Sequence, residues 1–379
     1  MSFGLVALPA HADLSQNDGI LHAEQFGCVG DGKSNNDGCA SKLALACKEQ
    51  CSVEFGAGRF LFSAPWDFVF PDDANRALSI RGQGAGVTNL LFKGTDGVRV
   101  TYAAHHSDSS HFKDFTIIQT SANVGTGISV TGSSALQVDP STFENVTLLA
   151  AQITNGGWAT GIALKGVSFV NFNGVSWFAP NSNLGTGISI QGQTEKKAFA
   201  IQFQFANCIF QNGAVGILYG PYIQGVQISN SQFTNMDTAI VVASEGAAQL
   251  FVSNSQIDTQ KAGVVINSPI AQFGYSNNLQ YIHPGQIGIG INAYATGNIN
   301  NSDFSGPGAG SGSIGIFSAD GLSPAISISG NRIAGFDTGI YLGKQSQGFL
   351  VYNNTFVGTG LSPNKSDVVN AGSASQKKQ

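Results

Sequence analysis

The stretch Gly187-Ile188-Ser189-Ile190 is one copy of a pattern that recurs from about residue 125 to residue 358. In each copy a small residue precedes Ile or Val, after which apolar and polar positions alternate. Other copies begin at Gly127, Gly161, Gly216, Ala239, Gly263, Gly288, Gly315 and Gly339. Successive Ile/Val positions lie 23 to 34 residues apart. A period in the twenties, with alternation inside each repeat, predicts a solenoid of stacked β-coils that works through a long lateral surface.

A second column of residues keeps register with the first. Each member is an apolar residue followed by a spacer and then Asn, and Gly174 and Gly330 fill the Asn slot in two further repeats. The seven asparagines are Asn145, Asn207, Asn230, Asn254, Asn277, Asn301 and Asn353. Coils stack about 4.8 Å apart, so we expect the carboxamides to superimpose and to donate to one another inside a bend. Asp114 aligns with this ladder, which predicts a structural role for it.

Together these columns predict an all-β fold, a right-handed parallel β-helix of about ten to eleven coils with an N-terminal capping helix. The leucine consensus of a leucine-rich repeat is absent. We expect a possible signal peptide remnant at 1–12, the cap and first strands at 13–75, the β-helix at 76–360 and a polar C-terminal tail at 361–379. Such a rod is compatible with a monomer or a homotrimer.

The composition of the chain limits the classes of partner that it can bind. Only 11% of residues are charged and the net charge is −5, so the basic stripe of a nucleic-acid-binding protein is missing. No apolar run reaches the roughly 18–20 residues of a membrane span. The neutral, hydrogen-bonding outer surface suits a polysaccharide.

Four of the five cysteines lie within 24 residues: Cys28, Cys39, Cys47 and Cys51. Such a cluster could form either two disulfides or a zinc site, and the spacing of the cysteines favours disulfides that staple the cap. Cys208 is expected to be a buried thiol. The apolar run from Phe3 to Leu8 precedes Ala10-His11-Ala12, which is similar to the end of a secretory signal. These features predict a secreted or periplasmic protein.

The N-terminal region resembles a known signature. Phe26 to Asp37, with Gly30-Asp31-Gly32 at its centre, precedes a helical stretch to about Gln50, and Val53 to Phe62 follows. This arrangement is similar to the N-terminal signature of pectin-lyase-like β-helix proteins of the rhamnogalacturonase, epimerase and tailspike type, with Gly56 where the family has Pro. The resemblance implies a β-helix that acts on polysaccharide outside the cytoplasm. It transfers no catalytic residue, and Asp31 and Asp37 are expected to serve turns and the start of the helix.

The longest loops lie early in the chain, on both sides of the Ile-x-Val strands, and predict a walled groove. A carbohydrate groove needs aromatic faces and hydrogen-bonding groups. The candidate substrate-binding residues are Trp158, Trp177, Tyr102, Gln191, Thr131 and Asn267.

The acidic candidates in this groove are Asp139, Glu195 and Glu245. Two coils of stacking would separate Asp139 from Glu195 by about 9–10 Å. Inverting glycosidases hold their carboxyl groups about 6.5–9.5 Å apart, so this pair favours inversion if it is catalytic. Alternatively, these carboxylates are merely solvated loop residues.

A second cluster could serve a lyase or C5-epimerase. Such an enzyme needs a cation for the uronate carboxylate and a base for the C5 proton. Arg99 and Lys165 could supply the cation, and His105, His106 or Tyr102 the base, with Asp108 beside them. We predict no metal and no cofactor, because adjacent histidines in an extended loop point apart.

The catalytic signatures of polygalacturonases, alginate epimerases and pectate lyases are absent from the sequence. Three hypotheses therefore remain. We expect a polysaccharide-degrading enzyme, with a glycoside hydrolase ahead of a uronate lyase or epimerase. The alternative is a non-catalytic carbohydrate-binding β-helix such as an adhesin or tailspike-like binder.

Overall fold

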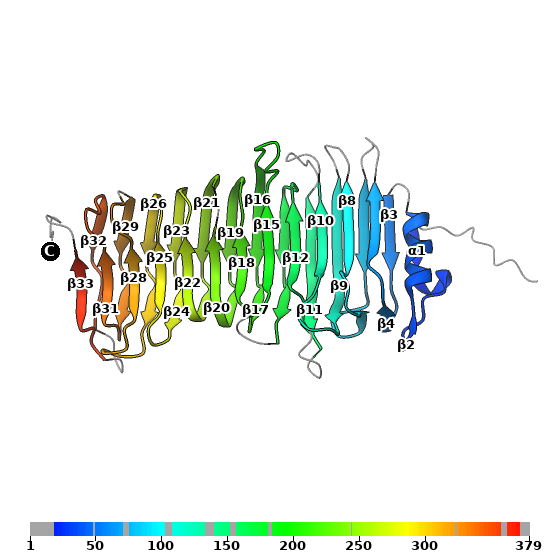
Figure 1. Ribbon diagram of the computed structural model, residues 1–379, viewed down its shortest axis with the longest axis horizontal. Helices are drawn as coiled ribbons and strands as arrows, with labels where there is room; N and C mark the ends of the chain where they lie inside the picture. The colour runs from blue at the N-terminus through cyan, green and yellow to red at the C-terminus, as the bar shows by residue number, and fades with distance from the viewer. Residues whose placement is uncertain are drawn as a thin grey trace, which may run out of the picture.

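The chain forms a rod of stacked β-coils that all run the same way round (Figure 1). The computed structural model describes residues 19–47, 50–70, 76–102, 108–132, 140–151, 157–180, 184–243, 245–322, 324–357 and 362–371. Every strand pairing recorded between the coils is parallel. The parallel β-helix predicted from the repeat is confirmed.

Strand pairings run along the rod in three columns. The first column contains β5 (Trp66–Phe70), β8 (Val98–Tyr102), β10 (Thr126–Thr131), β12 (Thr160–Lys165), β15 (Thr186–Gln191), β18 (Val215–Tyr219), β25 (Ile287–Ile291), β28 (Ile314–Ser318), β31 (Thr338–Leu342) and β33 (Ser366–Asn370). The second contains β1 (Ile20–His22), β3 (Gln50–Glu54), β6 (Ala77–Arg81), β13 (Val170–Asn173), β16 (Ala200–Ala206), β19 (Ile223–Ser229), β21 (Ala247–Ser253), β23 (Ile270–Ser276), β26 (Ala295–Asn300), β29 (Ala325–Ser329) and β32 (Phe349–Tyr352).

The third column contains β2 (Asp31–Asn35), β4 (Gly58–Phe62), β7 (Thr88–Phe92), β14 (Ser176–Phe178), β17 (Ile209–Gln211), β24 (Leu279–Ile282), β27 (Asp303–Ser305) and β30 (Arg332–Ala334). Four longer strands span two columns. Both β9 (Ser109–Gln119) and β11 (Ser141–Ala150) pass from the second column into the third. Both β20 (Gln232–Val242) and β22 (Gln256–Ile266) pass from the third column into the first.

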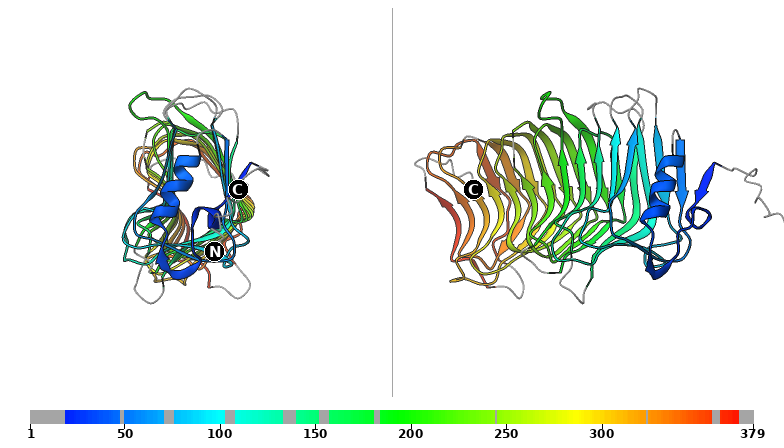
Figure 2. Two further views of the ribbon diagram at one scale, coloured as in Figure 1. Left: turned by 90° about the vertical axis from the view of Figure 1, so that its right-hand side faces the viewer. Right: turned by 45° about the vertical axis from the view of Figure 1, so that its right-hand side comes forward.

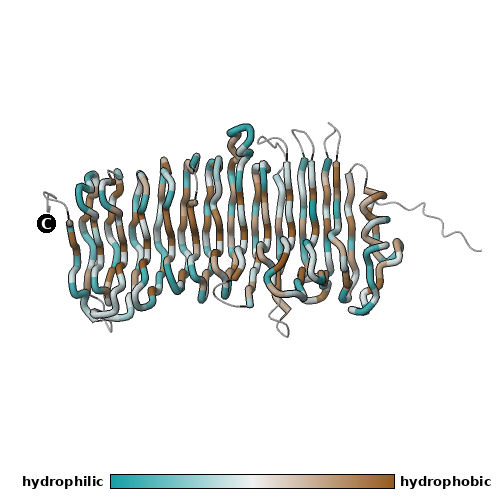
Figure 3. The backbone as a smooth tube through the Cα atoms, in the orientation of Figure 1, coloured by the Kyte–Doolittle hydropathy of each residue, from teal (hydrophilic) through white to brown (hydrophobic). Residues whose placement is uncertain are grey.

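Apolar and polar residues are interspersed along the coils (Figure 3), and the buried apolar residues form stacked rows in the core. In β10, Ile128 and Val130 are buried and Ser129 between them points outward. Four phenylalanines in the second column stack directly on one another, with centroid separations of 4.9, 4.9 and 4.4 Å: Phe112, Phe143, Phe172 and Phe205.

The seven asparagines form the corner between the second and third columns. All have left-handed backbone conformations, with φ between 49° and 56°. Asn tolerates this conformation better than most residues, and Gly174 and Gly330 adopt it as well. Asp114 has a φ of 59° at the same corner, as predicted. The prediction that the amides point into the bend is wrong, because these seven side chains are exposed.

A buried polar ladder lies one residue further on. Each side-chain oxygen accepts the backbone N–H of the equivalent residue in the preceding coil, at 2.9 to 3.2 Å. The acceptors are Ser231, Ser255, Asn278, Ser302, Asn331 and Asn354, and the first donor is the amide of Cys208. This "internal ladder" satisfies backbone groups that the turn removes from the sheet pairing. Cys208 itself is a buried free thiol, as predicted, and burial raises its pKa to about 12.

Helix α1 (Asp37–Ala46) lies across the N-terminal end of the rod, beside the 3-10 turn η1 (Ala23–Phe26) (Figure 2). Cys39, Ala40 and Leu43 are its buried residues. The helix ends at Ala46, four residues earlier than expected. The disulfides Cys28–Cys39 and Cys47–Cys51 confirm the disulfide prediction over the zinc site.

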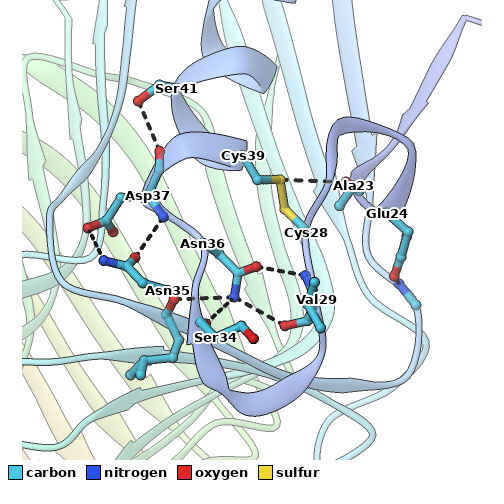
Figure 4. Close-up of a disulfide and its surroundings, with 12 residues drawn as sticks. Ala23, Glu24, Cys28, Val29, Ser34, Asn35, Asn36, Asp37, Cys39 and Ser41 are labelled. Carbon is cyan, nitrogen blue, oxygen red and sulfur yellow. Dashed lines mark hydrogen bonds between the residues drawn. A yellow bond between two sulfur atoms is a disulfide. The ribbon is translucent and has the colours of Figure 1, made fainter.

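The residues before α1 are held by a dense set of hydrogen bonds around the first disulfide (Figure 4). Asn36 accepts from the Val29 amide at 2.7 Å and donates to three carbonyl oxygens. Asp37 accepts from the amides of Ser63 and Ala64, so it joins the helix start to a later strand end. Asp31 accepts from the amides of Lys33 and Ser34 in a tight turn. The structural roles predicted for the two aspartates fit these contacts.

The coils continue beyond the expected end of the β-helix at residue 360. Strand β33 pairs with β31 in the first column, so part of the predicted tail belongs to the rod. Residues 1–12, the expected signal remnant, lie outside the described residues. Within the described part of the chain, no helix has both the length and the apolar character needed to span a bilayer.

Candidate functional site

A pocket of about 310 Å3 opens on the first column, where the turn between β15 and β16 projects from the rod (Figure 1). Its lining residues are Thr131, Gly132, Lys165, Gln193, Glu195 and Lys196. Thr131, Lys165 and Gln191 are Cα partners on successive coils, so their side chains form an outward row. This "lateral pocket" lies between that row and the turn.

The turn is fixed on the coils beneath it. Gln193 and Ala198 exchange two backbone hydrogen bonds of 3.0 and 3.1 Å, which close the loop between them. The buried side chain of Gln193 donates from Nε2 to the Gly132 carbonyl oxygen at 3.0 Å, two coils away. The charged tip of the turn is therefore attached to a rigid base.

An ion pair forms one side of the lateral pocket. Lys165 Nζ lies 2.7 Å from Glu195 Oε1. This hydrogen bond lowers the pKa of the Glu195 carboxyl group, so Glu195 is ionised at neutral pH. Lys196 and Lys197 follow in the same turn, so Lys165 and the described residues of the turn carry three lysines and one glutamate, a formal charge of +2 (3 − 1). This sign is opposite to that of the whole chain.

Arg99 lies in the first column but is held by aspartates. Its Nε and Nη2 bond the two carboxylate oxygens of Asp67 at 2.5 and 2.8 Å, and its Nη1 lies 3.3 Å from Asp96. The bond to Asp67 raises the pKa of Arg99. A cation neutralised by two carboxylates attracts a substrate carboxylate poorly.

Both predicted groove tryptophans are core residues. Trp158 is 2% exposed and Trp177 is 1% exposed. The Trp177 ring packs against Gly161, Gly187 and Gly213, whose lack of side chains leaves space for the indole. The prediction that these rings line a groove is wrong, because the coil interior holds them.

Two polar candidates are also buried. The Tyr102 hydroxyl donates to the Ser109 carbonyl oxygen at 2.8 Å, and burial raises its pKa well above the ordinary value. Asp108 is 2% exposed and accepts from the Arg76 amide at 2.9 Å. Neither side chain reaches the lateral surface, so the roles predicted for them in binding and catalysis are wrong.

Two of the remaining candidates are exposed at the surface, and three lie outside the described residues. Glu245 and Asn267 are exposed, and Asn292 donates to Asn267 at 2.8 Å. Asp139, His105 and His106 lie outside the described residues. Sequence reasoning missed Gln193 and Lys196. Their signal was three consecutive charged residues, Glu195 to Lys197, in a chain with few charges.

A protein-family profile matches residues 170–367, slightly more than half of the 379 residues. Its description is "Periplasmic copper-binding protein (NosD)". The chain belongs to this NosD family. No curated protein matches the NosD-family chain.

Solved structures similar to this NosD-family chain share its coiled architecture. The pre-mature gene product 12 of bacteriophage phi29 matches at 11% identity over 94% of this chain and 56% of that one, with a TM-score of 0.63. PfbA, a surface adhesin of Streptococcus pneumoniae, matches at 12% identity over 94% and 93%, with a TM-score of 0.54. The A-module of mannuronan C-5 epimerase AlgE6 from Azotobacter vinelandii matches at 13% identity over 94% and 100%, with a TM-score of 0.48. The predicted pectin-lyase-like, right-handed β-helix is confirmed, and likeness at these identities shows the fold alone.

Proposed function

We propose that this NosD-family chain binds an acidic polysaccharide at the lateral pocket. The observation that carries the proposal is the local excess of lysine on a fixed turn beside a row of hydroxyl and amide groups. Lysine ammonium groups bind carboxylates, and Thr131 and Gln191 offer partners for sugar hydroxyls. A carboxylate-bearing sugar chain combines both requirements.

We place this activity outside the cytoplasm. Two disulfides in the cap fit an oxidising compartment, and the family description includes the word periplasmic. The description also names copper. The described residues contain no group of three or more His, Cys, Asp or Glu side chains that could hold a metal ion, so we propose no copper site.

Binding can be measured by electrophoresis through gels that contain polygalacturonate or alginate. We expect Lys165→Gln and Lys196→Gln each to weaken retention about tenfold, because each removes a charge-assisted contact. Retention should also fall with rising salt.

Lys113→Gln provides a matched control. Lys113 pairs with Glu144 at 2.8 Å in the second column, so it resembles the Lys165–Glu195 pair but lies away from the pocket. Full retention of Lys165→Gln, or an equal loss in Lys113→Gln, would contradict the proposal.

Polysaccharide hydrolysis is the second function that we propose. Its support is the position of the Glu195 carboxylate in the lining of the lateral pocket, because an ionised carboxylate at a sugar-binding site can serve as base or nucleophile. The acid role then falls to Asp139. The lyase or epimerase alternative needs a cation for the uronate carboxylate. Arg99 is already held by Asp67 and Asp96, so that role would fall to the lysines of the lateral pocket.

One assay separates the three hypotheses. Wild type, Glu195→Gln and Asp139→Asn are incubated with acidic and neutral polysaccharides, and reducing ends and the ultraviolet absorbance of unsaturated uronates are followed together. Reducing ends lost in both variants but kept in Glu144→Gln would support hydrolysis. Unsaturated products would instead support a lyase. Binding without either product would identify a non-catalytic binder.

A further inference from the structure

The outer surface of the second column carries no charge over five successive coils. Strands β16, β19, β21, β23 and β26 contain no Asp, Glu, Lys, Arg or His. Their outward residues are mainly glutamine, asparagine and serine. One row of Cα partners on this surface is Gln204, Gln227, Phe251, Gly274 and Asn298.

Phe251 is the aromatic member of this row and is 36% exposed. Its ring occupies the space in front of Gly274 on the next coil: a Cβ atom on Gly274 would lie 2.5 Å from Cδ1 and 3.2 Å from Cε1. The ring therefore rests against the glycine on the next coil, and part of it is exposed to solvent. Gly274 makes this possible because any side chain would push the ring away.

Amide side chains precede and follow this ring in the same row. Gln227 is its Cα partner on the preceding coil, and Asn298 follows Gly274 on the next coil. Gln249 donates to Gln272 at 2.8 Å along one flank, which fixes the orientation of both exposed amides. Each amide offers both donors and acceptors.

We infer that this surface is a binding platform for a neutral polysaccharide. An aromatic ring packs against the C–H face of a pyranose, and amides exchange hydrogen bonds with its hydroxyl groups. Because charges are absent from the strands, the surface offers no ion pairing to an acidic sugar. Gln204 and Gln227, and likewise Gln249 and Gln272, are Cα partners on adjacent coils, so their amides lie one coil spacing of about 4.8 Å apart.

The platform and the lateral pocket are separate sites. They lie in different columns of the rod and differ in charge, so the platform does not depend on the proposed function of the pocket. Lys165→Gln should leave neutral-glycan binding unchanged.

The test uses affinity electrophoresis of the full chain with hydroxyethyl cellulose, galactomannan, starch and dextran. We expect at least one of them to retard the wild type. Phe251→Ala should weaken that retention about tenfold through loss of the packing surface. Gly274→Ala keeps the ring but lifts it from the backbone, and it should also weaken binding.

Tyr281→Ala is the matched control, because Tyr281 is a 42% exposed aromatic residue in the third column beside Asp258. Circular dichroism and thermal midpoints establish that each variant is folded. Failure of all four polysaccharides to retard the wild type would overturn the inference. So would unchanged binding in Gly274→Ala or an equal loss in Tyr281→Ala.

Discussion

At the scale of the residue, the corner asparagines have a backbone role. Their φ values of 49° to 56° are costly for most side chains, and their exposed amides have few partners. Within the described part of the chain, two of the seven donate to a side chain of the preceding coil: Asn145 to Asp114 at 2.9 Å and Asn207 to Asn173 at 3.0 Å. The residue type is thus explained by the turn rather than by stacked amides.

This role can be tested at Asn254, whose φ is 50°. We expect Asn254→Ala to lower the free energy of unfolding by about 1 kcal/mol, because Ala is strained in the left-handed conformation. The stability of Asn254→Gly should stay close to that of the wild type. The shift in the urea midpoint measures the effect. Asn292→Ala, at an exposed asparagine without positive φ, is the control, and an equal loss there would contradict the explanation.

Asp31 gives a prediction about pH. Its hydrogen bonds to the amides of Ser34 and Lys33 lower its pKa from 3.8 to about 2. A depressed folded-state pKa stabilises the protein above the unfolded value, and the effect is lost as pH falls through about 2. We therefore expect the carboxyl carbon of Asp31 to titrate near pH 2 by NMR. Ser34→Ala keeps the amide but removes the hydrogen bond that the Ser34 hydroxyl donates to Asp31 at 2.8 Å, so it should raise that pKa. A titration near 4 in the wild type would contradict the assignment.

Residue types alone did not reveal which groove candidates are accessible. Trp158 and Trp177 are near long loops in the sequence, yet the coil interior holds both rings. An aromatic residue beside a glycine-rich segment is compatible with either location. The packing of Trp177 against three glycines from different coils becomes visible only in three dimensions.

At the scale of the element, the internal ladder connects seven coils through six side-chain acceptors. Its oxygens all accept from the preceding coil, so the array has one direction along the rod. The sequence predicted a polar ladder at this bend but placed it one residue too early. The true position holds one Cys, three Ser and three Asn in irregular order, a mixed pattern that is less visible than a run of identical asparagines.

Adjacent residues allow the two roles to be compared. Asn278 accepts from the Ser255 amide and donates to the Val252 carbonyl, whereas Asn277 forms the exposed corner. We expect Asn278→Leu to cost about 2 kcal/mol or more, because two buried backbone groups lose their partners. Hydrogen exchange at the Ser255 amide should accelerate in that variant. Asn277→Gly should leave exchange unchanged, and faster exchange in both variants would contradict the distinction.

At the scale of the whole molecule, the rod is stabilised by contacts between neighbouring coils, so its first coil needs a cover. Helix α1 supplies that cover, and both disulfides lie in or beside it. The resemblance of Phe26 to Phe62 to a known signature predicted this cap well. The lateral pocket was harder to predict, since its turn interrupts the repeat and obeys no period.

The disulfides should contribute unequally. Cys28–Cys39 closes a separation of 11 residues and Cys47–Cys51 one of 4. Loop-closure entropy gives about 3 kcal/mol for the longer loop and about 2 kcal/mol for the shorter one. We expect the Cys28→Ala/Cys39→Ala variant to lose more stability than Cys47→Ala/Cys51→Ala, as measured by denaturant midpoints and by proteolysis of the cap. The reverse order would show that packing outweighs chain entropy.

Because every hydrogen bond of the internal ladder has the same direction, a coil could be inserted into the rod without breaking the ladder. The Ser231 amide donates to the Ser255 hydroxyl, 24 residues later in the chain. A duplicated coil would need this same hydrogen bond to the coil before it and to the coil after it. A second copy of residues 232–255 inserted after Ser255 would accept from one serine amide and donate to Asn278, leaving no backbone group unmatched in that slot. Gene duplication could lengthen this protein one coil at a time, and each added coil would extend the surface around Phe251.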